Sequence, residues 1–231
     1  MSPTSLLLHR VRRTACPAIA RTVPFALYIA VLMGASFLEP RLPDPRWLYL
    51  LQVAAPLLAL AFFAPGYTEL RSPGRAGARV WALAVAVGFA VFMAWIHLDV
   101  RWLSFGQAGG FDPTLPGGGF DWPWVVLRLA GAVLVVPVME ELFWRSFVMR
   151  VIDRADFLRM PPVSVSLKAL IVSSLLFGVE HSMWFAGILA GLAYGWLYLR
   201  SGNLWVPVAA HALTNLLLGL WVLSTGHWQF W

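Results

Sequence analysis

Charged side chains are scarce in this sequence. Aspartate, glutamate, lysine and arginine make up only 12% of its 231 residues, whereas hydrophobic residues make up 60% and the mean hydropathy is +0.73. Soluble domains carry roughly 25% charged and about 45–50% apolar residues. So few charges cannot cover a surface in contact with water or keep a chain unfolded. The composition therefore excludes a soluble globular domain and a disordered tail, and it indicates a chain surrounded by lipid.

Cysteine is nearly absent as well. The single Cys16 excludes a small secreted domain held together by disulfides. The sequence also lacks an internal repeat and a long linker, so we expect one integral membrane domain over residues 1–231. The pI of about 10.2 does not indicate a nucleic-acid partner, because lysine and arginine of a membrane protein collect in its cytoplasmic loops.

Seven apolar stretches, separated by charged residues, proline and glycine, are candidates to cross the bilayer. They cover residues 23–38, 47–63, 80–98, 122–149, 167–183, 184–199 and 204–224. About 20 residues cross a bilayer as a helix, so the sequence predicts an all-α, polytopic membrane helix bundle with about seven transmembrane helices. The first stretch has arginines before it and small residues at 34–36, as a cleaved signal peptide would. Its length and flanks favour an uncleaved helix.

The distribution of basic residues predicts the orientation of these helices. With the N-terminus inside, the inner side holds twelve: Arg10, Arg12, Arg13, Arg21, Arg71, Arg75, Arg79, Arg150, Arg154, Arg159, Lys168 and Arg200. The outer side holds three, Arg41, Arg46 and Arg101, and two more lie inside the fourth stretch. Because basic residues favour the cytoplasmic side, we expect the N-terminus inside and the C-terminus outside. We expect an integral membrane protein, in a bacterial inner (plasma) membrane.

The fourth stretch contains ionisable residues that are costly at membrane depth. Besides Arg128 they are Glu140, Glu141 and Arg145. Glu141 and Arg145 are four residues apart, so they share one helical face and can neutralise each other. Glu140 lies about 100° round the helix from Glu141 and is not held in that pair. We therefore expect Glu141 to be structural and Glu140 to be available for chemistry.

Two further stretches carry polar residues at a similar depth. The fifth ends with His181, and the seventh contains His211 and Asn215, again four residues apart. Counted from the inner ends at 1.5 Å per residue, Glu140 and these three residues lie about 12–20 Å deep. Each alone has a structural explanation, such as a hydrogen bond to a neighbouring helix. Their convergence from three helices predicts a shared intramembrane site.

Other residues near these positions have more modest interpretations. Glu180 can orient the ring of His181 or line an outer entrance, and Trp144 can form a wall of the site. Gly187, Gly191 and Gly195 recur every four residues in the sixth stretch, which indicates close packing of a neighbouring helix.

A carboxylate, two imidazoles and an amide, screened from bulk water, can hydrolyse an acyl bond. In one interpretation, Glu140 is the general base on a water, helped by His181, while His211 and Asn215 donate hydrogen bonds to the oxyanion. In the other, Glu140, His181 and His211 hold a divalent metal such as zinc, which makes the protein a metalloprotease. The sequence leaves both open.

The sequence lacks the motifs of the common soluble hydrolases. It has no His-Glu-x-x-His and no Gly-x-Ser-x-Gly, and Cys16 lies near the inner end of the first stretch, away from the other polar residues. Neither a soluble zinc protease nor a serine or cysteine nucleophile fits this pattern.

Three motifs follow one another on successive hydrophobic stretches. They are Glu140-Glu141-x-x-x-Arg145, Phe177-x-x-x-His181 and His211-x-x-x-Asn215. In this order they resemble the CPBP family of intramembrane proteases, the CAAX prenyl proteases and bacteriocin-processing proteins also called the ABI family. The length and the residues around Glu140 are most similar to the subgroup of CAAX prenyl protease-related proteins associated with exosortase systems.

The resemblance implies an all-helical membrane fold and hydrolysis of a peptide bond in a membrane-associated protein or peptide. It implies catalytic roles for Glu140, His181, His211 and Asn215, carried by catalytic core helices over residues 122–224. It also implies that Glu141, Arg145 and Phe177 support the motifs. It fixes neither the substrate, prenylated or not, nor a metal.

Two other functions remain as alternatives. The protein can be a non-catalytic membrane scaffold or immunity protein, or a transporter that uses Glu140 and the histidines as a proton relay. A transporter more often shows repeated halves, whereas the polar motifs here crowd the C-terminal half, which favours the enzyme.

Overall fold

The computed structural model describes residues 16–71, 76–105 and 110–231. Within these ranges the regular structure is helical, apart from one isolated bridge between Thr114 and Phe120. The all-α prediction is therefore confirmed. Four of the arginines predicted to face the inner side, Arg10, Arg12, Arg13 and Arg75, lie outside the described residues.

A helix or a succession of helices covers each predicted stretch. They are α2 (Pro17–Leu38), α3 (Arg46–Phe63), α4 (Ala78–His97), α5 (Trp122–Ala130), α6 (Val136–Glu141), α7 (Met149–Val151), α8 (Leu167–Val179), α9 (Trp184–Ser201) and α10 (Trp205–Thr225). Four helical stretches, Pro17–Ala35, Arg46–Gly66, Ala78–His97 and Trp205–Thr225, are long and apolar enough to cross a membrane. Large apolar side chains such as Met33, Leu58 and Phe89 are exposed on them, as lipid-facing surfaces require. The chain is a polytopic helical membrane bundle.

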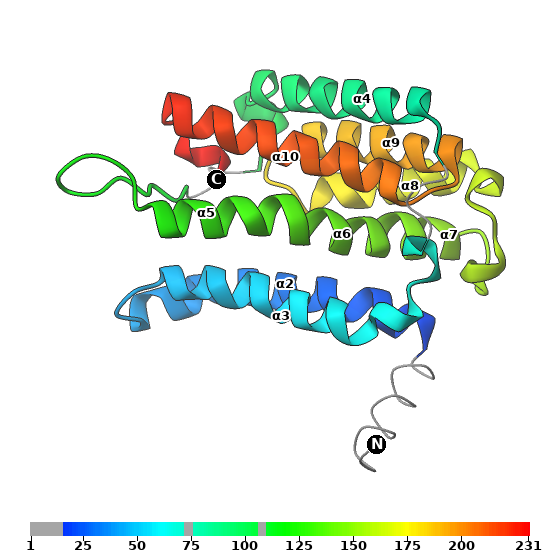
Figure 1. The fold of residues 1–231 in the computed structure, drawn as a ribbon, viewed down its shortest axis with the longest axis horizontal. Coiled ribbons are helices and arrows are strands. Elements are labelled where there is room, and N and C mark those ends of the chain that lie inside the picture. Colours follow the sequence, from blue (N-terminus) through cyan, green and yellow to red (C-terminus); the bar gives the residue numbers. More distant parts are fainter. Residues whose placement is uncertain (1–15, 72–75, 106–109) are drawn as a thin grey trace, which may run out of the picture. The chain divides into compact units, whose positions relative to one another are not determined.

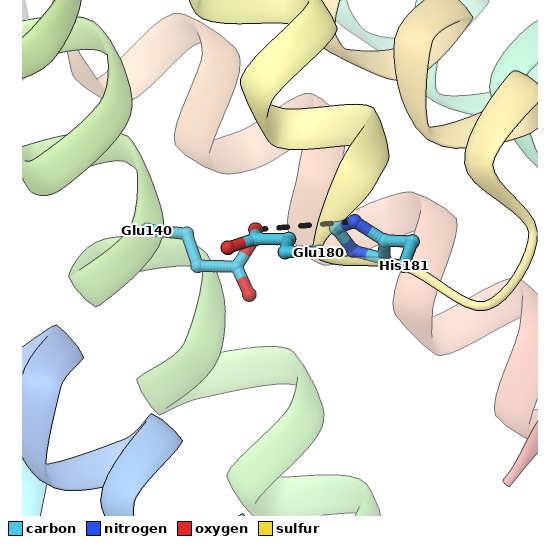
Figure 2. A group of neighbouring side chains, drawn as sticks. All are labelled: Glu140, Glu180 and His181. Atoms are coloured by element: carbon cyan, nitrogen blue, oxygen red, sulfur yellow. Dashed lines mark ion pairs between the residues drawn. The ribbon is translucent and has the colours of Figure 1, made fainter.

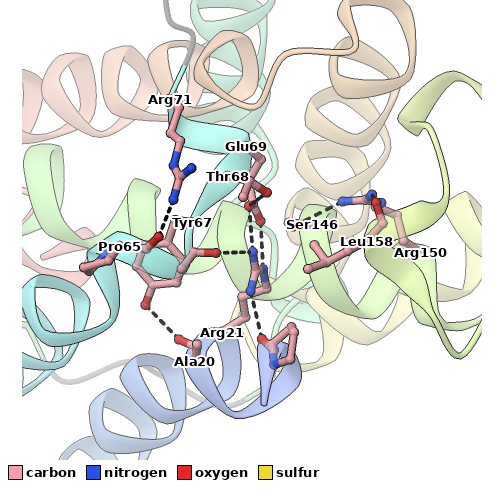
Figure 3. A network of polar contacts seen from close by, with 12 residues as sticks. Ala20, Arg21, Pro65, Tyr67, Thr68, Glu69, Arg71, Ser146, Arg150 and Leu158 are labelled. Atoms are coloured by element: carbon pink, nitrogen blue, oxygen red, sulfur yellow. Dashed lines mark hydrogen bonds and ion pairs between the residues drawn. The ribbon is translucent and has the colours of Figure 1, made fainter. Parts of the chain in front are cut away.

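The contacts divide the chain into two compact units, Met1–Ser72 and Pro73–Trp231. The prediction of a single domain over residues 1–231 stays a prediction. In the first unit, α2 and α3 form a hairpin that is closed by a buried ion pair. The guanidinium of Arg21 donates to both carboxylate oxygens of Glu69, at 2.7 and 2.6 Å, and lies over the ring of Tyr67 (Figure 3). The hydroxyl of Tyr67 donates in turn to the carbonyl of Ala20, so the first turns of α2 are bonded to the segment that follows α3.

In the second unit, α9 packs against α8, α10 and α4, and α10 packs against α4 and the helix that contains α6 (Figure 1). Glycines allow the closest approaches. A Cβ atom on Gly191 would lie 2.9 Å from the Cα of Ser174 in α8, and one on Gly88 would lie 2.6 Å from the carbonyl oxygen of Ala210 in α10. The packing role predicted for the glycines of α9 is confirmed.

Residues 122–151 form one long rod that is interrupted twice by wider π-helical turns, at Gly131–Val135 and Leu142–Val148. In a π-helical turn each N–H bonds to the carbonyl five residues earlier, as Val136 does to Gly131. The next such bond would join residue 137 to the carbonyl of Ala132. Pro137 has no N–H, so that carbonyl is left without an intrahelical partner.

The loop between α7 and α8 is fixed by polar contacts. Arg150 is buried and donates to the carbonyls of Met160 and Leu158, and it lies 3.5 Å from the hydroxyl of Ser146 (Figure 3). Ser166 caps the N-terminus of α8 by accepting from the N–H of Ala169. These contacts fix the start of α8 and with it the turn at its other end.

That turn is the main difference from the predicted helices. The stretch predicted over residues 167–183 ends as a helix at Val179, and Glu180, His181 and Ser182 form the connection to α9. The backbones of α8 and α9 come close enough here that a Cβ atom on Gly187 would lie 3.0 Å from the Cα of Gly178. The tight turn places Glu180 and His181 inside the unit, at the end of a helix that is shorter than a full crossing.

Candidate active site

Glu140 is a buried carboxylate near the end of α6. Only 6% of the residue is exposed, and its Oε2 atom has no hydrogen-bond partner among the described residues. An ionised carboxylate that is removed from water and left unpaired is strongly unfavourable. This environment therefore requires a proton, a cation or a substrate water at Glu140, which is typical of a functional group rather than a structural one.

Glu180 and His181 lie beside Glu140. Ligand-type atoms of the three residues all lie within 4.8 Å of one another, and Glu180 Oε1 is 3.9 Å from His181 Nδ1 (Figure 2). Glu140 comes from α6, whereas Glu180 and His181 come from the turn after α8. The structure thus brings Glu140 and His181 together, as the depth argument predicts, and adds a second carboxylate.

The ring of His181 is held by a hydrogen bond and by two aromatic neighbours. Its Nδ1 lies 2.7 Å from the carbonyl oxygen of Phe177, and a carbonyl can only accept, so Nδ1 carries the proton. Trp95 and Phe177 contact the ring at centroid distances of 5.4 and 4.6 Å. In the neutral imidazole, Nε2 is then the nitrogen with the free lone pair, available to a water or a metal.

Glu141 is fully buried and has two partners. Its Oε2 lies 3.1 Å from Arg145 Nε, so the predicted i,i+4 ion pair is confirmed. Its Oε1 lies 3.1 Å from His211 Nδ1, a contact that the spacing did not predict. Because an ionised carboxylate only accepts, His211 donates from Nδ1. Glu141 therefore both neutralises Arg145 and orients His211.

Arg145 completes this group through aromatic rings. Its guanidinium carbon lies 4.4 Å from the ring centroid of Phe177 and 5.5 Å from that of Tyr194. Its two Nη atoms have no hydrogen-bond partner among the described residues, so the ring faces take the place of hydrogen-bond acceptors. Phe177 thus contacts Arg145 and both histidines, since its centroid is 6.4 Å from that of His211.

The donor set differs from the one expected for a metal. The expected ligands are Glu140, His181 and His211, whereas the close group consists of Glu140, Glu180 and His181. His211 is turned toward Glu141 and stacks on Tyr194 at a centroid distance of 4.9 Å. The depth argument places residues along each helix but does not fix the direction of a side chain around it.

Asn215 bonds to the backbone of the interrupted helix. Its Nδ2 donates to the carbonyl of Ala132 at 2.8 Å, which is the carbonyl that Pro137 leaves without a partner. One N–H of the amide is therefore committed to the helix, and the second is left for another acceptor. This contact was not predicted, because it depends on the π-helical turn.

The hydrogen bonds and ring contacts of Trp144, Glu180 and Tyr194 were not predicted from the sequence. Trp144 donates from Nε1 to Glu180 Oε1 at 3.0 Å, which makes it a partner of Glu180 as well as the predicted wall. Tyr194 stacks on His211, and its hydroxyl donates to the hydroxyl of Thr214 at 2.7 Å. The sequence signals were weak: Glu180 precedes a motif histidine, and Tyr194 precedes a glycine of the packing stripe.

Arg128, the remaining charge of the fourth stretch, lies near the start of this rod. Its guanidinium lies over the rings of Phe111 and Trp231, at 5.3 and 5.8 Å from their centroids. These aromatic contacts explain a charge in α5 without a role in catalysis.

Residues 122–217 match the family model described as type II CAAX prenyl endopeptidase Rce1-like. No curated protein and no solved structure matches the chain. The matched segment begins with α5 and ends two residues after Asn215, so it contains all three motifs.

Proposed function

Because residues 122–217 match the family model of the type II CAAX prenyl endopeptidases, we propose that this chain is an intramembrane endopeptidase that cleaves a membrane-associated protein or peptide with an activated water. The observation that carries the proposal is the buried Glu140 with its unpartnered oxygen beside His181. A carboxylate without a structural partner, next to an imidazole with a free nitrogen, is suited to take a proton from water.

Glu140 is the general base in this mechanism. As the water oxygen bonds to the scissile carbonyl carbon, one proton of the water passes to Glu140, and the electron pair of the carbonyl moves to its oxygen. His181 holds the water through Nε2, because Nδ1 is occupied by the carbonyl of Phe177. The proton on Glu140 then passes to the leaving amine as the C–N bond breaks.

His211 and Asn215 stabilise the oxyanion. Since Nδ1 of His211 donates to Glu141, a hydrogen bond from Nε2 to the oxyanion requires the imidazolium form of His211. Asn215 uses one N–H for the carbonyl of Ala132 and offers the other. Removing one such donor typically lowers turnover by about 10²–10³-fold.

The substrate class follows from the family. We propose a peptide anchored in the membrane, with a prenylated C-terminal Cys-a-a-X segment as the first candidate, since that chemistry is in the description of the matched family. Membership of the exosortase-associated subgroup and a bacterial inner-membrane location are parts of the same proposal.

The decisive experiment uses Glu140→Gln, which keeps the shape of the side chain and removes the proton acceptor. The probe is an internally quenched peptide that ends in a farnesylated Cys-a-a-X, with the same peptide lacking the farnesyl group beside it. We expect turnover by the purified protein in detergent to fall ~10²-fold or more with an unchanged melting temperature.

Glu39→Gln is the matched control, since it removes an exposed carboxylate at the end of α2 and should leave turnover unchanged. If neither peptide is cleaved, membrane proteins are compared for cleavage products in cells carrying the wild type or Glu140→Gln. Identical profiles under conditions where deletion has a phenotype would replace the protease by the scaffold or proton-relay function.

A further inference from the structure

We propose that Glu180 is a second catalytic carboxylate, which shares one proton with Glu140 and acts as the acid partner of that base. The proposal rests on the proposed protease function and adds to it a residue that lies outside the three motifs. Its basis is the placement of two buried carboxylates and one imidazole around a common point (Figure 2).

The charges around the pair leave one of the carboxylates without a countercharge. Arg145, the cation of this region, forms its ion pair with Glu141, which also accepts from His211. Two carboxylates within 4.8 Å in a site of low dielectric constant repel each other when both are ionised. One proton shared between them removes the repulsion.

Trp144 holds Glu180 in place. It lies four residues after Glu140 on the same rod and donates from Nε1 to Glu180 Oε1 at 3.0 Å. Because an indole nitrogen can only donate, Oε1 is an acceptor whether or not the carboxyl carries a proton. The helix that carries the base also positions the acid, through a side chain that has no other polar atom.

Over one turnover, such a pair of carboxyl groups gives up and regains the same protons. Ionised Glu140 takes a proton from the attacking water, while protonated Glu180 gives its proton to the carbonyl oxygen, and a neutral gem-diol results. His211 and Asn215 hold that oxygen by hydrogen bonds. Glu140 then protonates the leaving nitrogen as the C–N bond breaks. One hydroxyl of the gem-diol returns its proton to Glu180 as the new carboxyl group forms, so both carboxylates end as they began.

A divalent cation on the same three residues is the competing explanation. The nitrogen of His181 that lies 3.9 Å from Glu180 is Nδ1, and it already donates to the carbonyl of Phe177 at 2.7 Å. A metal would instead bind the free Nε2 of His181, which leaves this hydrogen bond in place, so the chelation experiment below separates the two explanations.

The test compares Glu180→Gln and Glu180→Asp with the wild type on the farnesylated quenched peptide across pH. We expect the wild type to show a two-limbed profile, because activity needs one ionised and one protonated carboxyl. Glu180→Gln still accepts from Trp144 but cannot supply a proton, so turnover should fall ~10²-fold or more. Of the pH profile, only the rise on the acidic side, where Glu140 ionises, should remain. Glu180→Asp should keep both limbs at a reduced rate.

A second measurement needs no substrate. The infrared carbonyl stretch of a protonated carboxyl should be present in the wild type near neutral pH and shifted or lost in Glu180→Gln, because the carboxyl pair that shares the proton is then gone. If Glu180→Gln has the turnover, the pH profile and the infrared band of the wild type, the carboxyl pair is wrong, while the protease function stays intact. An active Glu140→Gln would overturn the protease function itself. Chelation that abolishes wild-type turnover, with recovery on added zinc and loss of bound zinc in Glu180→Gln, would replace the pair by a metal centre.

Discussion

At the scale of single residues, the site is governed by which carboxylate has a partner. Glu140 and Glu141 are neighbours in sequence, yet Glu141 forms an ion pair with Arg145 and accepts from His211, whereas among the described residues Glu140 Oε2 has neither kind of partner. The helical period predicts this division, because only Glu141 lies four residues from Arg145. The contact between Glu141 and His211 could not be predicted, since it joins positions 70 residues apart and depends on how α10 is rotated about its axis.

Glu141 should be needed both for stability and for turnover. Glu141→Gln leaves Arg145 as a buried charge without its counterion, which typically costs ~3–5 kcal/mol of unfolding free energy. It also weakens the group that orients His211, and loss of such an orienting carboxylate can lower turnover by ~10⁴-fold. Thermal unfolding in detergent and cleavage of the quenched peptide measure the two effects.

Asp156→Asn is the matched control for this prediction. Asp156 and Arg159 form an exposed ion pair, with side chains 55% and 78% exposed, so its loss should change stability by only ~0–1 kcal/mol. A Glu141→Gln protein that melts like the Asp156→Asn protein and remains active would contradict both roles of Glu141.

At the scale of elements, the helices were predictable and their irregularities were not. Apolar stretches bounded by charge, proline and glycine predict the helices within a few residues, as for α3, predicted over residues 47–63 and observed over Arg46–Phe63. The π-helical turns at Gly131–Val135 and Leu142–Val148 leave no periodic signal in the sequence. They arise where packing and Pro137 interrupt the regular i to i−4 hydrogen bonds of the helix. They also determine the position at which Asn215 bonds to Ala132.

The bond between Asn215 and Ala132 should depend on Pro137. In the wild type, Asn215→Ala leaves a half-buried carbonyl without its partner, at a cost of ~1–3 kcal/mol. In a Pro137→Ala background, residue 137 regains an N–H that can bond to Ala132 within the helix. The same Asn215→Ala change should then cost less than ~1 kcal/mol of unfolding free energy.

A double-mutant cycle on unfolding in detergent measures this coupling. Equal costs in both backgrounds would show that Asn215 does not replace the missing helical bond. Turnover separates the two roles of the amide. If its second N–H serves the oxyanion, the Asn215→Ala protein stays ~10²-fold slower even in the Pro137→Ala background, where stability is restored.

At the scale of the whole molecule, orientation follows from charge rather than from packing. Twelve basic residues on one side against three on the other predict an N-terminus inside. The single cysteine, Cys16, is exposed just before α2 and tests this prediction directly. In intact spheroplasts, a membrane-impermeant maleimide should leave it unmodified, whereas a permeant maleimide should modify it.

The matched variant is Cys16→Ser with Thr114→Cys, which moves the thiol to an exposed position in the predicted outer loop between α4 and α5. The impermeant reagent should modify this variant in intact spheroplasts, because the two positions are separated by an odd number of crossings. If the wild type reacts and the variant does not, the orientation is reversed. The turn after α8 that carries Glu180 and His181 would then approach the cytoplasmic side, and the substrates compared in cells would have to be those exposed there.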